Sequence, residues 1–230
     1  MSWLFRTSVL SPVEETDPDL PEHCTVVIVG TGAAGLGVGK RLAKSCRGDF
    51  LLLEQDVDLE RSLRRCAHTS GVWAHTRFDA ALRRACWDAP HSMWRLRASR
   101  GRMTANFMVL ATGSATRSVI PHVHGRDGRS LAELDTTVAG FPNLFTVVES
   151  DEAQLDLITH GLNLFARKGI REFEVRTDLE HERRSRRTAK RFNPHDYHLT
   201  VGHLYHGDPR YREVETVPVP SAVGSERLAP

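Results

Sequence analysis

The apolar residues of this chain gather in short continuous runs, which polar and glycine-rich stretches separate. The first run, residues 24–29, is rich in β-branched side chains, and further runs follow at residues 50–53, 107–111 and 143–148. Runs of this length are typical of strands that a parallel sheet buries on both faces. The pattern therefore predicts a buried strand at each of these places.

A different spacing, with apolar residues three and four apart, predicts a helix over residues 151–168. Asp151 is suited to cap its first turn, and Gly169 is suited to the positive φ that ends many helices. A short strand should follow at residues 172–176. The apolar stripe of the predicted helix consists of Leu155, Ile158, Leu162 and Phe165.

Strands and helices alternate along the chain, which indicates an α/β fold. The glycine-rich residues 30–39 lead from the first strand into another helix, which should end near Lys44. We therefore predict a three-layer, Rossmann-like FAD/NAD(P)-binding domain with a parallel sheet over residues 23–180. Within it, residues 55–102 form a poorly defined insert, because they are rich in arginine and only weakly periodic.

Two polar segments flank the predicted domain. Residues 1–22 are interpreted as a polar N-terminal arm, and residues 181–230 as an irregular, basic, His-rich and Pro-containing C-terminal tail.

The composition narrows the class of protein. With 40% hydrophobic and 26% charged residues, the chain is an ordinary globular one rather than fibrous or wholly disordered. Its apolar runs are too short to span a membrane, and its N-terminus shows no secretory pattern, so we expect a cytoplasmic protein without membrane association. A length of 230 residues does not comfortably hold two dinucleotide-binding domains of roughly 150 residues each. The net charge of +2 says little about partners.

The strongest chemical signal is a G-x-G-x-x-G motif between a predicted strand and a predicted helix. Its residues are Gly30, Thr31, Gly32, Ala33, Ala34 and Gly35. The first glycine permits a tight turn, the second lets a pyrophosphate approach the backbone, and the third lets the helix pack close to the strand. The helix N-terminus adds N–H groups and a partial positive charge that favour a phosphate.

An acid stands where the ribose of such a cofactor would need one. Glu54 follows Gly35 by about 20 residues, at the end of the second predicted strand, and can accept hydrogen bonds from a ribose hydroxyl. Strand, glycine loop, helix, strand and acid together indicate a dinucleotide site of the FAD or NAD type. The alternative is that the glycines serve only a tight turn.

Further motifs resemble segments of the flavin-containing and Baeyer–Villiger monooxygenases. Residues 70–73 (Ser-Gly-Val-Trp) resemble the G-G-T-W segment of that family, and residues 76–81 resemble an altered N-R-Y-P-G-A run. Residues 108–116 are similar to its second A-T-G strand. More specific are residues 125–133 and 138–145, which resemble segments from the C-terminal part of its FAD domain.

The resemblance implies an FAD-dependent oxidoreductase. Such an enzyme inserts one oxygen atom from O2 into a small, ketone-like organic substrate through a peroxyflavin. No residue of this sequence has the pattern of a catalytic acid or base, and we name none. The resemblance places five further residues at the cofactor, besides the glycine loop and Glu54. These residues are Gln55, Trp73, Ala111, Thr112 and Gly113.

Two motifs of the family are missing from this sequence. It has no second G-x-G-x-x-G, which in the family binds NADPH in an inserted domain, and no F-x-G-x-x-x-H-x-x-x-W/P fingerprint. The chain therefore resembles a shortened form that lacks the NADPH-binding domain. Electrons or reduced flavin should then come from a reductase, a partner subunit or transiently bound NADPH. The alternative is a catalytically inactive, internally deleted dinucleotide-binding remnant or an interaction protein.

Two polar clusters near the C-terminus are not expected to bind a nucleic acid or a metal ion. Residues 183–191 hold six basic side chains, but Glu180 and Glu182 stand beside them, so we expect a solvated face rather than a nucleic-acid site. A group of histidines lies among Pro and Gly residues without a cysteine or a well-spaced carboxylate, so we predict no metal site. These histidines are His195, His198, His203 and His206.

Overall fold

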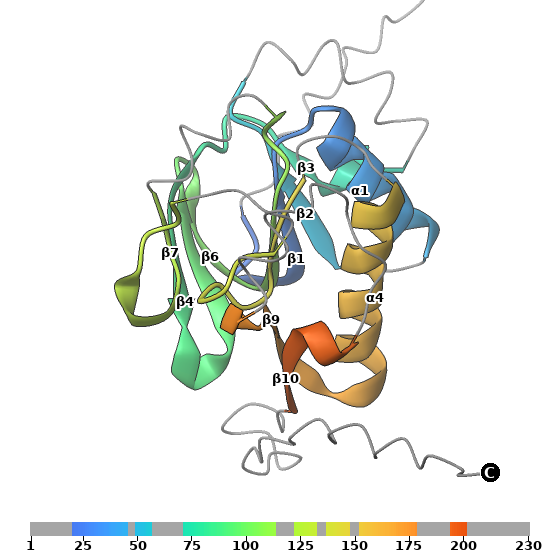
Figure 1. The fold of residues 1–230 in the computed structure, drawn as a ribbon. Helices are drawn as coiled ribbons and strands as arrows, with labels where there is room; N and C mark the ends of the chain where they lie inside the picture. Colours follow the sequence, from blue (N-terminus) through green and yellow to red (C-terminus); the bar gives the residue numbers. More distant parts are fainter. Residues whose placement is uncertain are drawn as a thin grey trace, which may run out of the picture.

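The computed structural model describes residues 20–45, 49–56, 71–113, 122–132, 137–147, 152–178 and 194–201. These residues form an eight-stranded sheet, a two-stranded ribbon, two α-helices and several short 3-10 turns (Figure 1). Neither α-helix has an apolar stretch long enough to cross a bilayer.

One half of the large sheet is parallel. β1 (His23–Val29) lies between β2 (Phe50–Leu53) and β6 (Gly101–Leu110), while β3 (Thr76–Arg77) pairs with β2 and β8 (Leu144–Thr146) with the C-terminal part of β6. The four apolar runs of the sequence correspond to β1, β2, the C-terminal part of β6 and β8, with Val148 outside the described residues. β1 is buried on both faces, as predicted, because its alternate residues pack into two separate cores.

The other half of the sheet is antiparallel. β4 (Leu82–Asp88), β5 (Met93–Ala98) and the N-terminal part of β6 form a meander, and the short β7 (Val123–His124) pairs parallel with β4. The sheet is therefore mixed rather than wholly parallel, and the expected poorly defined insert, residues 55–102, contains β3, β4 and β5. The sequence of β4 and β5 shows no continuous apolar run, because residues on only one face of these strands are buried.

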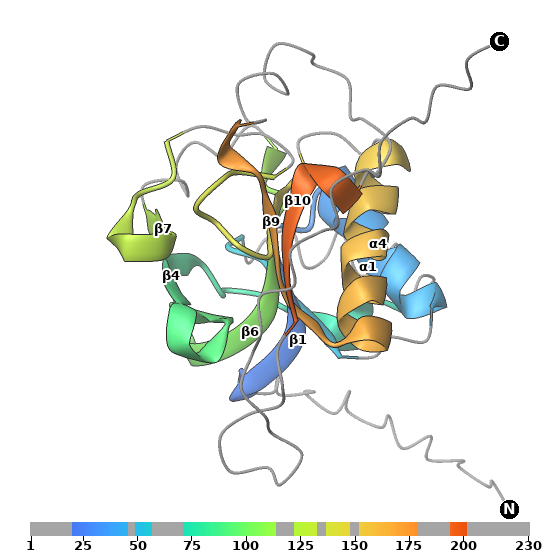
Figure 2. The same ribbon diagram turned by 60° about the horizontal axis from the view of Figure 1, so that its bottom comes forward.

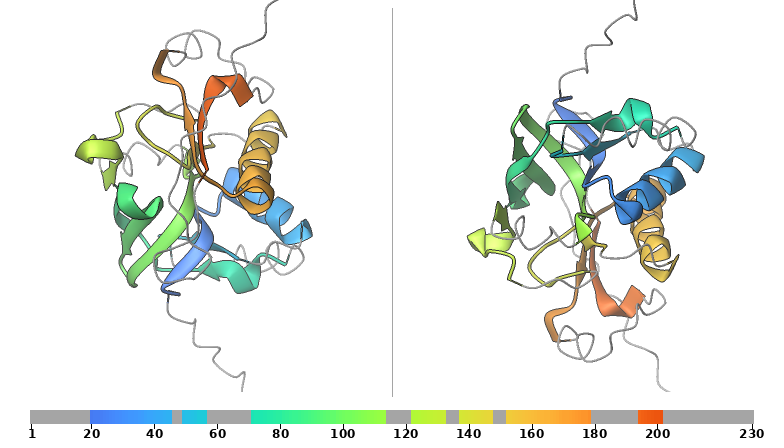
Figure 3. Two further views of the ribbon diagram at one scale, coloured as in Figure 1. Left: turned by 90° about the horizontal axis from the view of Figure 1, so that it is seen from below. Right: turned by 90° about the horizontal axis from the view of Figure 1, so that it is seen from above.

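The two α-helices, α1 (Ala33–Lys44) and α4 (Glu152–Lys168), lie on the same side of the sheet (Figure 3). Their apolar residues pack against one face of β1, β2 and β6 and form the first core. The meander curls over the opposite face and closes a second core. This arrangement confirms the predicted α/β, Rossmann-like class.

Helix α4 follows its predicted range closely. Gly169 ends it with a φ of 65°, as expected, whereas Asp151 lies outside the described residues. Arg41 on α1 forms ion pairs with Glu152 and Asp156 on α4. The two helices are thus joined at their exposed sides.

The predicted strand after α4 is β9 (Ile170–Val175), and it pairs antiparallel with β10 (Tyr197–Val201), which follows the 3-10 turn Pro194–Asp196 (Figure 2). The expectation of an irregular tail is therefore wrong for β10. Tyr197 is 1% exposed, and its ring stacks on Phe173 at 4.2 Å between centroids. The basic run 183–191 and all residues after 201 lie outside the described part of the chain.

Asn143 fastens β9 to the large sheet. Its side chain is fully buried, and its amide nitrogen donates to the carbonyl of Asn106 at 2.9 Å and to that of Arg171 at 2.7 Å. Its side-chain oxygen accepts the N–H of Phe173 at 2.7 Å. One amide therefore joins β6, the loop before β8, and β9.

Candidate functional site: the glycine loop

The glycine loop lies where the parallel strands end. The N–H of Gly30 donates to the carbonyl of Leu53, and the N–H of Ala111 donates to that of Val29, both at 2.8 Å. The carboxyl ends of β1, β2 and β6 therefore meet at the edge of the sheet from which α1 starts. In open α/β sheets this edge is where ligands bind.

Gly30 and Gly35 are required by the fold itself. Gly30 has a φ of 103°, and a Cβ on it would lie 2.6 Å from the carbonyl oxygen of Ala111. A Cβ on Gly35 would lie 2.0 Å from the carbonyl oxygen of Gly30, well inside van der Waals contact. Both residues let the loop, the helix and the turn after β6 approach one another more closely than a side chain would allow.

Gly32 is different, because nothing in the fold requires a glycine there. Its φ of −62° and ψ of −176° are open to any residue, and a Cβ would meet no atom within 4 Å. It is exposed and stands at the N-terminal end of α1, whose first turn carries no acidic side chain. The open space over Gly32 therefore borders a helix end that favours an anion.

Glu54 lies at the end of β2 beside the loop and is 8% exposed. One of its carboxylate oxygens accepts hydrogen bonds from the N–H and the hydroxyl of Thr31, and the other accepts the N–H of Asp56 at 2.9 Å. A carboxylate offers about four acceptor positions, so about one is left for a ribose hydroxyl. Glu54 therefore also fixes the loop to β2.

The remaining predicted site residues surround the loop unequally. Ala111 is buried and lies close to both Gly30 and Gly35, and Thr112 lies close to Gly30. Gly113 follows with a φ of 56°. The turn after β6 is therefore brought to the loop, as the sequence predicts.

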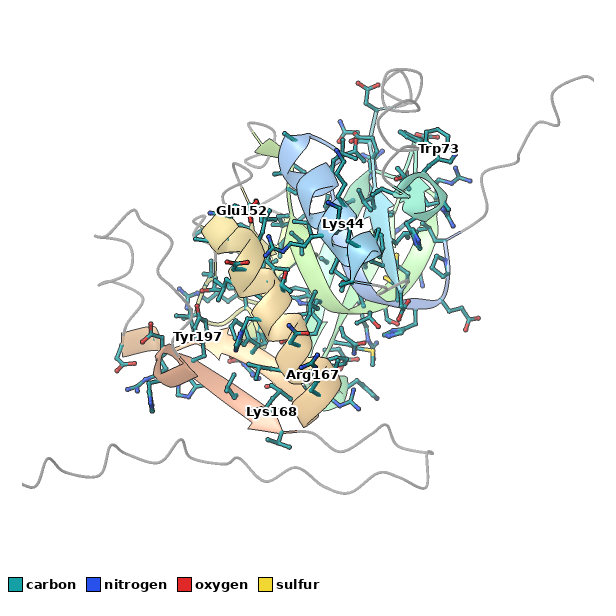
Figure 4. All side chains as sticks on the ribbon, turned by 90° about the vertical axis from the view of Figure 1, so that its right-hand side faces the viewer. Lys44, Trp73, Glu152, Arg167, Lys168 and Tyr197 are labelled. Atoms are coloured by element: carbon teal, nitrogen blue, oxygen red, sulfur yellow. The ribbon has the colours of Figure 1, made fainter. Side chains whose placement is uncertain are left out.

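Gln55 and Trp73 lie on the other side, next to β2. Gln55 is exposed, and Trp73 is half-buried, with its ring 5.4 Å from that of Phe78. In Figure 4, α1, on which Lys44 is labelled, lies between α4 on the left and Trp73 on the right. The place of Trp73 at the cofactor stays a prediction.

Sequence reasoning missed how residues 76–80 hold the acid. The N–H of Glu54 donates to the carbonyl of Arg77, and the N–H of Ala80 donates to the carbonyl of Glu54, both at 2.8 Å. The resemblance to N-R-Y-P-G-A marks this run but does not disclose the role of its backbone. Gly39 continues the small-residue face of α1, and the structure shows what this face packs against, because a Cβ on Gly39 would come within 3.1 Å of the Val72 side chain.

The described residues contain no group of three or more His, Cys, Asp or Glu side chains that could hold a metal ion. Cys24 is buried in β1, and this burial raises the pKa of its thiol to about 12, so it is not a nucleophile. His195 and His198 lie at the turn before β10 and on β10, while His203 and His206 fall outside the described residues.

No family model matches this chain. It is similar to a Baeyer–Villiger monooxygenase from Streptomyces coelicolor, at 26% identity over 147 residues, in a match that covers 46% of this chain. It is also similar to a Baeyer–Villiger monooxygenase from Pseudomonas aeruginosa, at 23% identity over 150 residues, in a match that covers 47% of this chain. This chain spans 28% of the length of each of these curated relatives.

Solved structures of larger monooxygenases are also similar to parts of this chain. An oxidized steroid monooxygenase bound to NADP matches 40% of this chain and 26% of that chain, at 21% identity and a TM-score of 0.35. The closed structure of cyclohexanone monooxygenase matches 41% of this chain and 26% of that chain, at 13% identity and a TM-score of 0.36. The resemblance to Baeyer–Villiger monooxygenases that the motifs indicate is confirmed, on the curated relatives, for just under half of this chain.

Proposed function

We propose that this chain binds FAD at the glycine loop and acts as a flavin-dependent oxidoreductase of the Baeyer–Villiger monooxygenase type. The cofactor would lie with its pyrophosphate over Gly32 and with its ribose beside Glu54. Both curated relatives are Baeyer–Villiger monooxygenases.

The observation that carries the proposal is the contrast between the three glycines of the motif. Gly30 and Gly35 are explained by backbone contacts inside the protein, whereas Gly32 meets no protein atom that would exclude a side chain. A ligand that approaches the backbone at this point supplies the missing reason for a glycine. The alternative, in which the motif serves only a tight turn, does not account for Gly32.

The loop's surroundings suit the two charged and polar parts of such a cofactor. The start of α1 offers backbone N–H groups without a competing acidic side chain, which favours a pyrophosphate. Glu54 is held rigidly by Thr31 and Asp56, so its remaining acceptor position is oriented in advance. These residues bind and orient the cofactor, and the flavin, when bound, would supply the redox chemistry.

We further propose that the substrate is a small, ketone-like organic molecule into which one oxygen atom of O2 is inserted. Because this sequence has no second dinucleotide motif, reducing equivalents would come from a reductase, a partner subunit or NADPH that binds transiently.

Flavin binding is tested first. The purified protein is incubated with FAD, freed of excess cofactor and examined for the visible absorption bands of bound flavin. We expect bands for the wild type and for Ala166→Val, which adds the same branched side chain at an exposed position of α4, and none for Gly32→Val. Absence of flavin from the wild type, or equal uptake by Gly32→Val, would refute the proposed site.

Catalysis is tested on the flavin-loaded protein. NADPH is added without oxygen, and bleaching of the flavin bands is followed with and without a reductase. Reduction followed by oxygen-dependent conversion of a cyclic ketone supports the monooxygenase. Bound flavin that no donor reduces would instead support a non-catalytic dinucleotide-binding protein.

A further inference from the structure

The outer face of the antiparallel meander carries a row of arginines across three adjacent strands. Arg84 on β4 stands opposite Arg97 on β5, and Arg97 stands opposite Arg102 on β6. All three side chains are exposed. Arg83, which a β-bulge leaves without an opposite partner, is exposed beside them. We refer to these four residues as the arginine row.

Without a bound partner, the arginine row lowers the stability of the protein. Like charges that stand directly opposite on neighbouring strands destabilise a sheet. Among the described residues no carboxylate pairs with Arg84, Arg97 or Arg102, although Arg84 donates to the sulfur of Cys86 at 3.2 Å. The adjacent Arg95 shows the contrast, because its side chain is held by Asp88. The arginine row thus resembles half of an ion-pair cluster.

The row is remote from the proposed cofactor. Arg102 lies near the start of β6, while the glycine loop contacts Ala111, just after its end. At about 3.3 Å per residue, the strand separates Arg102 from Ala111 by roughly 30 Å. The arginines therefore do not bind the pyrophosphate of that cofactor, and the row needs a different anion.

We propose that the arginine row docks a carboxylate-rich surface of a partner protein. Guanidinium groups present planar, paired donors that match carboxylates, and several in one row on a rigid sheet favour an extended acidic segment over a single small anion. This interaction does not depend on flavin binding.

The same face is poorly suited to nucleic acid. Single-stranded nucleic acids stack their bases on aromatic rings, but Trp87 and Trp94 of the meander are buried on the opposite face. The groove of a duplex admits a helix or a two-stranded ribbon rather than the flat face of a wide sheet. The net charge of +2 is also small for a duplex-binding protein.

The test uses the full chain and a fluorescein-labelled peptide of about ten glutamates, with binding followed by fluorescence anisotropy at low salt. Because each exposed ion pair contributes little, we expect the triple variant Arg84→Gln/Arg97→Gln/Arg102→Gln to bind about tenfold more weakly. A matched variant, Lys40→Gln/Arg167→Gln/Lys168→Gln, removes the same charge from exposed positions on the two helices and should bind within about twofold of the wild type. Figure 4 shows Arg167 and Lys168 at the end of α4.

Three outcomes would overturn the proposal. The first is no binding of the peptide by the wild type, and the second is an equal loss in both variants, which would mean that only net charge matters. The third is tighter binding of a single-stranded or duplex DNA of the same charge, with the loss again confined to the arginine variant. Circular dichroism of both variants shows whether they remain folded.

Discussion

Replacing Gly32 with alanine separates the demands of the fold from those of a bound cofactor. The new methyl group would enter open space in a backbone conformation that alanine adopts readily. Restricting the unfolded chain should stabilise the protein by about 0.4–1 kcal/mol, while alanine is a poorer N-cap than glycine by a similar amount. The free energy of unfolding of the cofactor-free protein should therefore change by less than about 1 kcal/mol.

The matched variant Gly35→Ala should behave in the opposite way. Its methyl carbon would lie 2.0 Å from the carbonyl oxygen of Gly30, and the backbone at this point has no flexible side chain that could move aside. We expect a loss of at least about 3 kcal/mol, because α1 must shift away from β1.

The assay is thermal unfolding with and without FAD, combined with a titration of FAD fluorescence. At an FAD concentration about 100 times the Kd, binding should stabilise the wild type by about 2.7 kcal/mol, or roughly 5–10 °C in Tm. Gly32→Ala should unfold within about 4 °C of the cofactor-free wild type and lose this FAD-induced shift, with affinity lowered about 100-fold. A full FAD-induced shift in Gly32→Ala would refute the reasoning, as would a variant that no longer folds.

Three further predictions concern other parts of the molecule. The Cys24 thiol should resist alkylation at pH 9 until the chain unfolds. Burial raises the pKa of this thiol to about 12, so above pH 9 the thiol ionises in the unfolded chain before it does so in the folded protein. The free energy of unfolding should therefore fall as the pH rises above 9, and Cys24→Ala should lessen this fall in urea titrations. Arg126→Leu should lower the free energy of unfolding by about 3 kcal/mol, because it leaves Glu172 and Glu174, two largely buried carboxylates of β9, without their cationic partner. A loss below about 1 kcal/mol would contradict this. Arg97→Glu should raise the free energy of unfolding by about 1 kcal/mol, because Arg84 and Arg102, which stand opposite position 97, would then face a negative charge. Arg167→Glu should not raise it.

The sequence alone predicted the elements that depend on short-range patterns. The parallel strands show as continuous apolar runs because both of their faces are buried, and α4 shows as a stripe because only one of its faces is. Gly169 was recognisable as the end of that helix because positive φ is a local property of the backbone. The glycine loop and Glu54 were also recognisable, because the motif is defined by the order of its residues along the chain.

Other features depend on which segments meet in space, and no local pattern discloses that. β10 became visible only through its pairing with β9, from which residues 176–196 separate it in the sequence. The strands of the meander pair with their neighbours in sequence, but they show no continuous apolar run because only one of their faces is buried. Strands with one exposed face carry arginines that look like a polar linker until the register places Arg97 between Arg84 and Arg102.

The three glycines of the motif show the same division. Their spacing predicted the loop and a different role for each of Gly30, Gly32 and Gly35. The tertiary structure adds the contacts, because a Cβ at Gly30 or Gly35 would strike backbone atoms and a Cβ at Gly32 would not. Likewise, the sequence placed Glu54 at the end of a strand, and the fold decided that most of its acceptor capacity is used by the protein itself. The physical reason is that backbone geometry is local, whereas close contacts are decided by how distant segments pack.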